Sequence, residues 1–340
     1  MTVTEPRPPA EPGADLPSAL RVAGLRVDFP QRSGVLHAVR SVDLQVRRGE
    51  VLALLGESGS GKSITARAVM RLCPPSAQIT AEAIEVDGAD VLHASLSELH
   101  RLRGEKMAMV FQDPLSALNP VLSVGSQLGE LFRIHRGMRR RQARAEAEQL
   151  LAAVGIPDPR GRVRNFPHQC SGGMRQRILI ALAIALRPGL LIADEPTTAL
   201  DVTVQAQILD LLRSLQHEMN LAILLITHDL GVVCEVADQV AVMYAGRIVE
   251  TGATEQLLAR PAHPYTRALL DSVPQAHSAE DLPVIAGSPP PGDQIPPGCS
   301  FAPRCPLAQD RCRRVLPLLE TVAPGRTAAC HRAQEVLHGR

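Results

Sequence analysis

Apolar and polar positions alternate near the start of the chain, a pattern that is typical of β-strands. Residues 22–29 and residues 39–46 both follow it. Residues 51–55 are apolar throughout and precede a glycine-rich turn, which suits a strand buried on both faces. Residues 63–72 then have the apolar spacing of a helix, which we expect to end before Pro74.

The pattern changes again further along the chain. Residues 114–186 are mostly helical in character, with a strong helix-forming stretch at 143–154. The other predicted elements are a hairpin at 84–91 turning at Asp87-Gly88, strands at 190–193 and 221–227, a helix at 204–219 between them, and a hairpin at 240–249 turning at Ala245-Gly246. Alternating strands and helices predict an α/β fold with a largely parallel sheet.

Changes in composition divide the chain into three parts. Residues 1–18 are rich in proline and polar residues and predict a disordered tail, because they cannot bury enough apolar surface to become ordered. Residues 19–260 form the α/β domain, with 113–186 as an inserted helical subdomain. Residues 261–340 are again rich in proline and form a small C-terminal extension.

Composition and charge exclude several classes of protein. The net charge is +1, aromatic residues make up 2% of the chain and tryptophan is absent, so neither charge nor stacking favours nucleic acid as a partner. The N-terminus lacks the basic start and apolar middle of a signal peptide. The longest apolar run, residues 178–186, lies between two arginines and is far shorter than the ~20 residues that span a bilayer. Any work at a membrane therefore needs partner subunits.

A phosphate-binding loop follows the strand at 51–55. The eight residues fit the pattern G-x-x-x-x-G-K-[ST]: Gly56, Glu57, Ser58, Gly59, Ser60, Gly61, Lys62 and Ser63. Glycines let backbone N–H groups surround phosphate oxygens, and the helix that follows adds the positive end of its dipole. Lys62 would supply a charge toward the β- and γ-phosphates, and the Ser63 hydroxyl would bind Mg²⁺. The alternative is a glycine-rich turn with an unrelated lysine.

Two acids end the predicted strand at 190–193. Asp194 and Glu195 would lie at the carboxyl end of a buried strand, where open parallel sheets bind ligands. Asp194 would hold Mg²⁺, and Glu195 would orient or deprotonate the attacking water. A strand that ends in acids is common in proteins, so this interpretation depends on the phosphate-binding loop.

A short segment resembles the signature motif of ATP-binding cassette (ABC) ATPases, and more narrowly that of the peptide and nickel importer branch. It reads Cys170-Ser171-Gly172-Gly173-Met174-Arg175-Gln176-Arg177. The resemblance covers roughly residues 20–335 and implies a P-loop ATPase with an antiparallel β subdomain and a helical subdomain. It also implies that Ser171, Gly172 and Gly173 approach the γ-phosphate of an ATP held by a partner subunit.

Three further residues match other motifs of this family. Gln112 resembles the Q-loop glutamine, which also contacts Mg²⁺; Asp201 resembles the D-loop aspartate, and His228 the switch histidine. Taken alone, Gln112 could be a turn residue and His228 a core histidine. The aromatic residue that stacks on adenine in many relatives is not evident here. Phe29 is our prediction for it, with a core strand residue as the alternative.

The C-terminal extension concentrates four of the seven cysteines: Cys299, Cys305, Cys312 and Cys330, spaced C-x5-C-x6-C-x17-C. Residues 261–269 resemble the start of the C-terminal extension of oligopeptide and dipeptide transporter ATPases, and some members of this branch carry a [4Fe–4S] cluster. The resemblance implies one here, and the surrounding arginines would offset its negative charge. Zinc, with His331 replacing one cysteine, and no metal at all are the alternatives.

The resemblance therefore implies an ATP-hydrolysing motor subunit of an importer, peripheral at the cytoplasmic face of the cell membrane. Its expected partners are two membrane permeases, an extracytoplasmic solute-binding protein, and a second ATPase subunit, with a heterodimer favoured over a homodimer. Peptides are the expected cargo, with nickel or another small solute as the alternative. Chromosome-maintenance ATPases, two-domain translation ATPases and P-loop kinases fit less well, because the chain lacks a long coiled coil, has one nucleotide domain and carries the signature.

Overall fold

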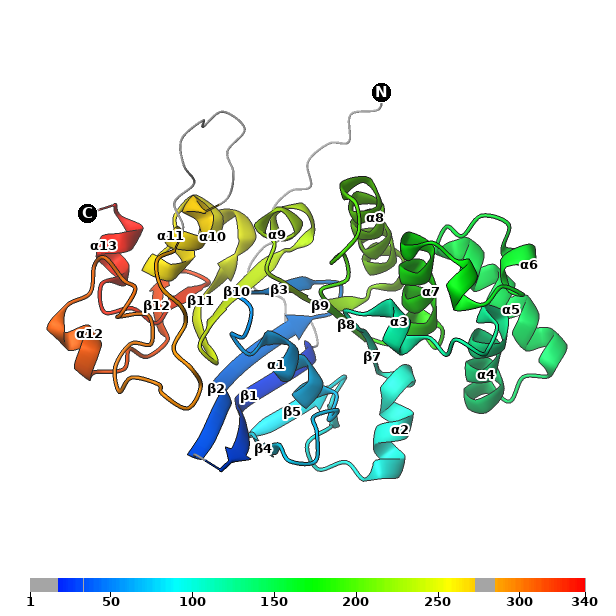
Figure 1. The fold of residues 1–340 in the computed structure, drawn as a ribbon, viewed down its shortest axis with the longest axis horizontal. Coiled ribbons are helices and arrows are strands. Elements are labelled where there is room, and N and C mark those ends of the chain that lie inside the picture. Colours follow the sequence, from blue (N-terminus) through cyan, green and yellow to red (C-terminus); the bar gives the residue numbers. More distant parts are fainter. Residues whose placement is uncertain (1–17, 33, 273–284, 340) are drawn as a thin grey trace.

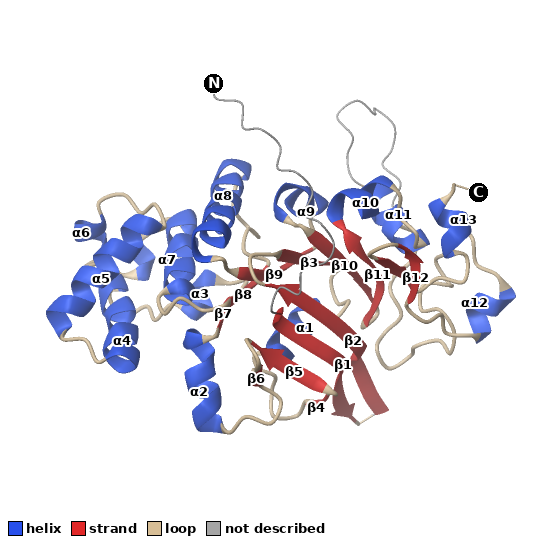
Figure 2. Cartoon of the chain, turned by 180° about the vertical axis from the view of Figure 1, so that it is seen from behind, coloured by secondary structure: helices blue, strands red, loops and turns tan. Residues whose placement is uncertain are grey.

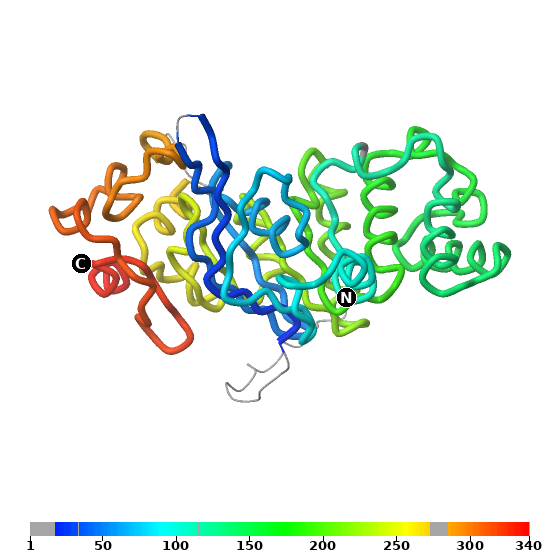
Figure 3. Tube along the Cα trace, turned by 90° about the horizontal axis from the view of Figure 1, so that it is seen from below, coloured from blue at the N-terminus to red at the C-terminus, as the bar shows by residue number. Residues whose placement is uncertain are grey.

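The computed structural model describes residues 18–32, 34–272 and 285–339. The predicted disordered tail lies outside the described residues except for Ser18, which begins the first strand. The described chain is elongated, with a two-sheet body at its centre, a helical arm on one side and the C-terminal extension on the other (Figure 1, Figure 3).

An antiparallel sheet forms the N-terminal subdomain. Its strands are β1 (Ser18–Gln31), β2 (Gly34–Arg47), β4 (Gln78–Thr80), β5 (Ala83–Val86) and β6 (Ala89–Asp90), in the order β2-β1-β5-β6 with β4 also paired to β1. The predicted hairpin turns at Asp87 and Gly88, whose φ angles of 46° and 71° fit a tight two-residue turn.

A second sheet forms the centre of the molecule. Its eight described strands run in the order β12-β13-β11-β10-β3-β9-β8-β7. Five of them are parallel: β10 (Gln239–Tyr244), β3 (Val51–Leu55), β9 (Ala222–Thr227), β8 (Leu190–Asp194) and β7 (Met107–Val110). The predicted parallel α/β sheet is thus confirmed, although the sequence analysis did not predict β7.

Helices cover both faces of the central sheet (Figure 2). Helix α1 (Lys62–Val69) contacts β1 and β2 of the antiparallel sheet and β8 of the central one, so it packs between the two sheets. The other helices of the body are α2 (Leu96–Glu105), α8 (Val202–Met219), α9 (Leu230–Val236), α10 (Thr254–Ala259) and α11 (Pro264–Asp271). Apolar side chains of both sheets and of α1 share one buried cluster, which fixes the position of the loop between β3 and α1.

The predicted helical subdomain is confirmed as an arm inserted between β7 and β8 (Figure 1). It contains α3 (Pro114–Ala117), α4 (Val124–Arg136), α5 (Arg140–Ala153), α6 (Pro159–Arg162), a 3-10 turn (Pro167–Gln169) and α7 (Gly172–Ile184). Its buried side chains continue into those of the central sheet and α8. The arm is therefore packed against the body rather than attached by a loose linker.

The C-terminal extension continues the central sheet. Strands β12 (Glu320–Ala323) and β13 (Arg326–Ala328) form a hairpin, and β13 pairs with β11 (Arg247–Ala253). The short helices α12 (Asp310–Arg314) and α13 (Ala333–Leu337) lie beside it. A buried ion pair joins extension and body, because Arg326 Nη2 lies 3.0 Å from Oε1 of Glu250, whose side chain is fully buried. Sequence periodicity did not predict this hairpin.

Candidate functional site

The loop from Gly56 to Ser63 joins β3 to α1, as predicted. A side chain at Gly56 would place Cβ 2.2 Å from the Met243 carbonyl oxygen, so only glycine fits there. Gly61 has φ 105°, and a Cβ would lie 2.5 Å from the Ala38 carbonyl oxygen. Gly56 lets the loop pass close to the Met243 backbone after β3, and Gly61 lets the backbone turn tightly at the start of α1, where the helix dipole favours a phosphate.

Lys62 lies inside this loop. Its Nζ donates to the carbonyl oxygens of Gly56 and Glu57 at 2.7 and 2.9 Å, and the residue is 5% exposed. Burial lowers the pKa of Lys62, while the nearby carboxylates of Glu195, Asp194 and Glu57 raise it. A buried ammonium group at the start of a helix is suited to bind phosphate, which could take the place of its carbonyl contacts.

Two of the three predicted magnesium ligands, Ser63 and Asp194, lie together, while the third, Gln112, bonds to Glu195. Ser63 Oγ donates to Asp194 Oδ1 at 2.8 Å, although 131 residues separate them. Asp194 ends β8 and is 2% exposed, and burial raises its pKa. A hydroxyl and a carboxylate at the start of a phosphate-binding helix are the oxygen donors that Mg²⁺ takes beside a nucleotide.

Glu195 is the centre of a hydrogen-bonded group. Gln112 Nε2 donates to its Oε2 at 2.7 Å, and His228 Nδ1 lies 3.1 Å from its Oε1. Thr198 Oγ1 also donates to Oε2 at 3.0 Å. The structure therefore brings together the three residues predicted as catalytic, from three separate loops. Thr198 was missed by the sequence analysis; its place three residues after Glu195 is the signal that could have found it.

The backbone of Glu195 is unusual for a residue with a side chain. Its φ is 48°, in the left-handed region, and its N–H donates to the Ile226 carbonyl at 2.9 Å. Non-glycine residues in this region cost free energy and are found where the surrounding structure imposes them, often at active sites. The strained turn directs the carboxylate toward Gln112 and His228.

The signature residues begin helix α7. Ser171 is the N-cap of that helix, with its Oγ accepting from Met174 N–H, and Asp201 is the N-cap of α8, accepting from Val204 N–H. Gly173 packs so closely on α8 that a Cβ would lie 2.6 Å from Val204 Cγ1. Among the described residues no hydrogen bond or ion pair joins Ser171–Gly173 to the phosphate-binding loop. Within one copy of the described chain, the signature residues and the phosphate-binding loop are therefore not joined by hydrogen bonds.

Phe29 lies on β1, where it pairs with Leu36 of β2 and packs, partly buried, against the core shared by the two sheets. Its role in binding adenine remains a prediction.

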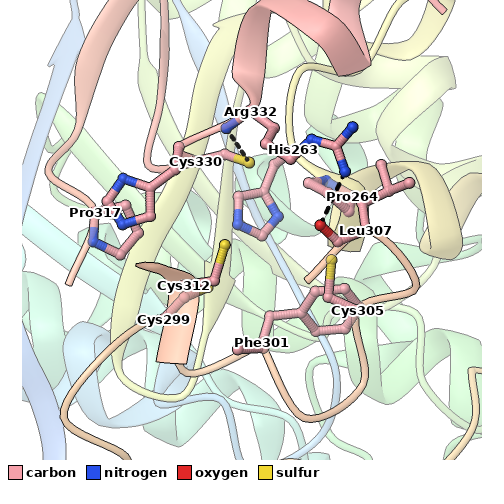
Figure 4. Close-up of a pocket in the computed structure, with 12 residues that line it drawn as sticks. His263, Pro264, Cys299, Phe301, Cys305, Leu307, Cys312, Pro317, Cys330 and Arg332 are labelled. Atoms are coloured by element: carbon pink, nitrogen blue, oxygen red, sulfur yellow. Dashed lines mark hydrogen bonds between the residues drawn. The ribbon is translucent and has the colours of Figure 1, made fainter. Parts of the chain in front are cut away.

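A second feature lies in the C-terminal extension. Four cysteines line one cavity of about 20 Å³ together with His263 and His331; they are Cys299, Cys305, Cys312 and Cys330. Figure 4 shows the cysteine side chains gathered around the His263 ring. All seven cysteines are free thiols. Among the described residues, no group of three or more His, Cys, Asp or Glu side chains has the arrangement of a metal site.

Burial sets the charge state of the groups around this cavity. His263 is 1% exposed, and its Nδ1 accepts from the Tyr265 N–H at 3.0 Å, which puts the ring proton on Nε2. Nε2 is buried and makes no hydrogen bond of good geometry, although the Ala329 backbone is near enough to raise the pKa of the ring against the effect of burial. Burial lowers the pKa of His263 to about 3 and raises that of Cys330 to about 12. The cavity is thus an apolar space lined by a neutral imidazole and by thiols, and burial raises the pKa of Cys299, Cys305 and Cys330.

The fold and the residues around Lys62 and Glu195 define an ATP-binding cassette, that is, a P-loop ATPase with a signature helix on an inserted arm. The ATP-binding cassette MJ0796, solved as a dimer in a post-hydrolysis state bound to ADP and Pi, matches this chain with a TM-score of 0.62 and 25% identity, over 69% of this chain and 98% of that one. CbiO1 from Clostridium perfringens, part of the transporter complex cbiONQ, matches with a TM-score of 0.60 and 29% identity, over 71% of this chain and 91% of that one.

Sequence comparison gives the branch of the family. Residues 39–198 match the ABC transporter family model, and residues 249–312 match the oligopeptide/dipeptide transporter C-terminal region. The dipeptide transport ATP-binding protein DppD of Bacillus subtilis is 49% identical over 88% of this chain and 90% of its own length. DppD of Escherichia coli is 48% identical over 92% of this chain and 96% of its own. The chain belongs to the ABC transporter ATP-binding subunits of the branch with this C-terminal region, and it is an ATPase.

Each helix in the described part of the chain is too short or too polar to span a lipid bilayer.

Proposed function

We propose that this ATPase drives the import of peptides through separate permease subunits. The names of the relatives at about half identity support this cargo, since both are dipeptide transport proteins. The observation that carries the motor function is the meeting of Gln112, Glu195 and His228 beside the Ser63–Asp194 pair. Nickel or another small solute is the alternative cargo.

The residues divide the work of hydrolysis between them. Lys62 and the loop N–H groups would bind the β- and γ-phosphates, and Ser63 and Asp194 would hold Mg²⁺, which neutralises phosphate charge. Glu195 would orient or deprotonate the attacking water, and its contact with Gln112 and His228 would fix the carboxylate for that step. Gln112 lies at the junction of β7 and the helical arm, so it would also couple nucleotide binding to the position of that arm.

We infer that ATP is bound between two subunits. Ser171, Gly172 and Gly173 would meet the γ-phosphate held by the phosphate-binding loop of a partner, and Asp201 would lie at the same interface. The dimeric form of the similar cassette bound to ADP and Pi supports this arrangement. A related second ATPase is the favoured partner, and a second copy of this chain is the alternative. Assembly with two permeases and a solute-binding protein would place the subunit at the cytoplasmic face of the membrane.

The test of cargo is uptake in cells that carry the complete transporter. A strain whose only peptide importer contains this subunit should accumulate a radiolabelled dipeptide, and Lys62→Ala should abolish that uptake. Unlabelled dipeptide should compete for uptake, whereas nickel should not. Uptake that persists in the Lys62→Ala strain, or nickel uptake without dipeptide uptake, would overturn the proposal.

We propose that the four cysteines hold a [4Fe–4S] cluster. The donor set fits, because four thiols and no carboxylate line the cavity, and the Nε2–H of His263 would gain an anionic acceptor. Iron would also ionise thiols whose pKa burial has raised.

Anaerobic purification of the full chain decides between the metals. The expected result is about four iron and four sulfide per chain with a broad absorbance near 400 nm, lost in Cys305→Ser. Cys234→Ser is the control, because that exposed thiol lies outside the cavity. Zinc without sulfide would mean that the cysteines bind zinc and not a cluster. Finding neither metal would rule out both the cluster and the zinc site.

A further inference from the structure

One arginine of the C-terminal extension reaches the phosphate-binding loop. Arg304 precedes Cys305, which lines the cysteine cavity, yet its guanidinium makes a two-pronged ion pair with Glu57, the second residue of the loop. Nη1 donates to Oε2 at 2.7 Å and Nη2 to Oε1 at 3.0 Å. The Arg304 side chain is 5% exposed and that of Glu57 is 26% exposed. The pair is therefore largely shielded from water, where charge interactions are strong.

Every N–H of the guanidinium has an acceptor. Besides the two bonds to Glu57, Nη1 donates to Tyr244 Oη at 3.3 Å, Nη2 to the Ile285 carbonyl at 3.2 Å, and Nε to the Ala286 carbonyl at 3.0 Å. The hydrogen bond to Glu57 raises the pKa of Arg304 above its usual value. Five donors with five acceptors hold the side chain in one orientation, and lysine, with three donors on a single nitrogen, could not replace it.

The extension also holds the backbone of the same loop residue. The Glu57 N–H donates to the hydroxyl of Tyr265 at 2.9 Å, and Tyr265 lies fully buried near the start of α11. The remaining backbone group of Glu57, its carbonyl, accepts from Lys62 Nζ at 2.9 Å. Arg304 and Tyr265 thus fix a residue that in turn contacts the lysine expected to bind phosphate.

An aromatic cluster joins the two contacts to the cysteine cavity. The rings of Tyr244 and Tyr265 lie 4.5 Å apart between centroids, and Phe301 lies 5.3 and 5.4 Å from them. The Arg304 guanidinium carbon lies 5.9 Å from the Phe301 ring centroid. Phe301 itself lines the cysteine cavity. The side chains between cavity and phosphate-binding loop are therefore in continuous contact.

We propose that Arg304 and Tyr265 are positioning residues for ATP binding, through which the C-terminal extension holds the phosphate-binding loop in its nucleotide-binding form. They act through Glu57 and touch no phosphate themselves. Residues far beyond the ATP-binding domain in sequence are then part of the ATP site. Loss of the Arg304 or Tyr265 contact lowers nucleotide affinity, while a change at an exposed site elsewhere in the extension does not.

The test is a double-mutant cycle on the full chain, with binding of a fluorescent ATP analogue in the presence of Mg²⁺ as the readout. Arg304→Ala leaves the Glu57 carboxylate without its partner, and we expect nucleotide affinity to fall about tenfold. Glu57→Ala should have a similar effect. Because the two act through one contact, the double variant should bind no more weakly than the worse single variant.

Two further variants separate positioning from a general loss of structure. Tyr265→Phe removes only the hydroxyl that accepts from Glu57 N–H, so it should weaken nucleotide binding several-fold while the thermal unfolding temperature without nucleotide stays close to that of the wild type. Arg314→Ala, at an exposed site on α12 of the same extension, is the matched control and should bind like the wild type.

Either of two results would overturn the proposal. The first is wild-type nucleotide affinity in both Arg304→Ala and Tyr265→Phe. The second is a double variant of Arg304 and Glu57 whose loss equals the product of the two single losses, since that would mean that the residues act independently. If Arg304→Ala does not fold, Tyr265→Phe alone decides between the outcomes.

Discussion

His263 gives a prediction about stability and pH. Its imidazole is 1% exposed and its pKa is lowered to about 3 from an ordinary value of 6.5 by burial. In the unfolded chain the same group titrates near its ordinary value. Below that value the unfolded state binds a proton that the folded state does not, so stability contributed by this group is present at neutral pH and is lost as the pH falls.

The size of the effect follows from the two pKa values. At about pH 5, an unfolded histidine with a pKa of 6.5 is about thirtyfold more often protonated than neutral, while the buried ring, with a pKa of about 3, remains neutral. A thirtyfold preference corresponds to about 2 kcal/mol of unfolding free energy. The loss begins near pH 6.5 and grows until the pH approaches 3.

The matched variant is His263→Asn. Asparagine also suits the N-cap of α11, where His263 Nδ1 accepts from Tyr265 N–H, but it does not titrate. Urea unfolding of both proteins, measured at about pH 8 and about pH 5 on metal-free samples, gives the free energies. Other titrating groups, including the buried Glu250, are common to both proteins and cancel in the difference.

We expect the wild type to lose about 2 kcal/mol more than His263→Asn between these two pH values. An equal pH dependence in the two proteins would mean that His263 is not held neutral by burial, and would refute the reasoning. A larger loss in the variant would do the same.

Three other predictions concern single contacts. Glu195→Gln should bind ATP but release phosphate at least about a hundredfold more slowly, as expected for a lost general base; wild-type turnover would exclude that role. Arg326→Ala should lower the unfolding free energy by about 3 kcal/mol in urea, because it leaves the fully buried Glu250 carboxylate unpaired; a loss below about 1 kcal/mol would contradict the importance of this pair. Gly173→Ala places a Cβ 2.6 Å from Val204 Cγ1, so ATPase activity should fall with nucleotide affinity unchanged. Adding Val204→Ala should restore the ATPase activity. Wild-type activity in Gly173→Ala would show that α7 and α8 can separate freely.

The nucleotide site could be predicted from the sequence because its chemistry is local. The loop from Gly56 to Ser63 needs a strand, a tight turn and a helix in order, and all three follow from apolar spacing and glycine. The acids at 194–195 follow a run of apolar residues in the same way. Family resemblance then supplied Gln112 and His228, which no local pattern identifies, and the structure brings both to Glu195.

The extension could not be predicted in the same way. Its strands have only four and three residues, too short for a periodicity to be recognised. They are ordered because β13 pairs with β11 and Arg326 neutralises Glu250, contacts that span 76 residues. The sequence suggested a cysteine-rich segment held by a metal; in the described structure, sheet pairing and a buried ion pair hold it.

The sequence by itself determined the class of protein, since strand, loop, helix and signature each depend on residues close together in the chain. Only the tertiary structure decided which distant groups meet. Ser63 reaches Asp194 across 131 residues, and Arg304 reaches Glu57 across 247. Such contacts depend on how sheets and helices stack around a shared core. The free energy of that packing comes from many side chains, so no single sequence motif determines it.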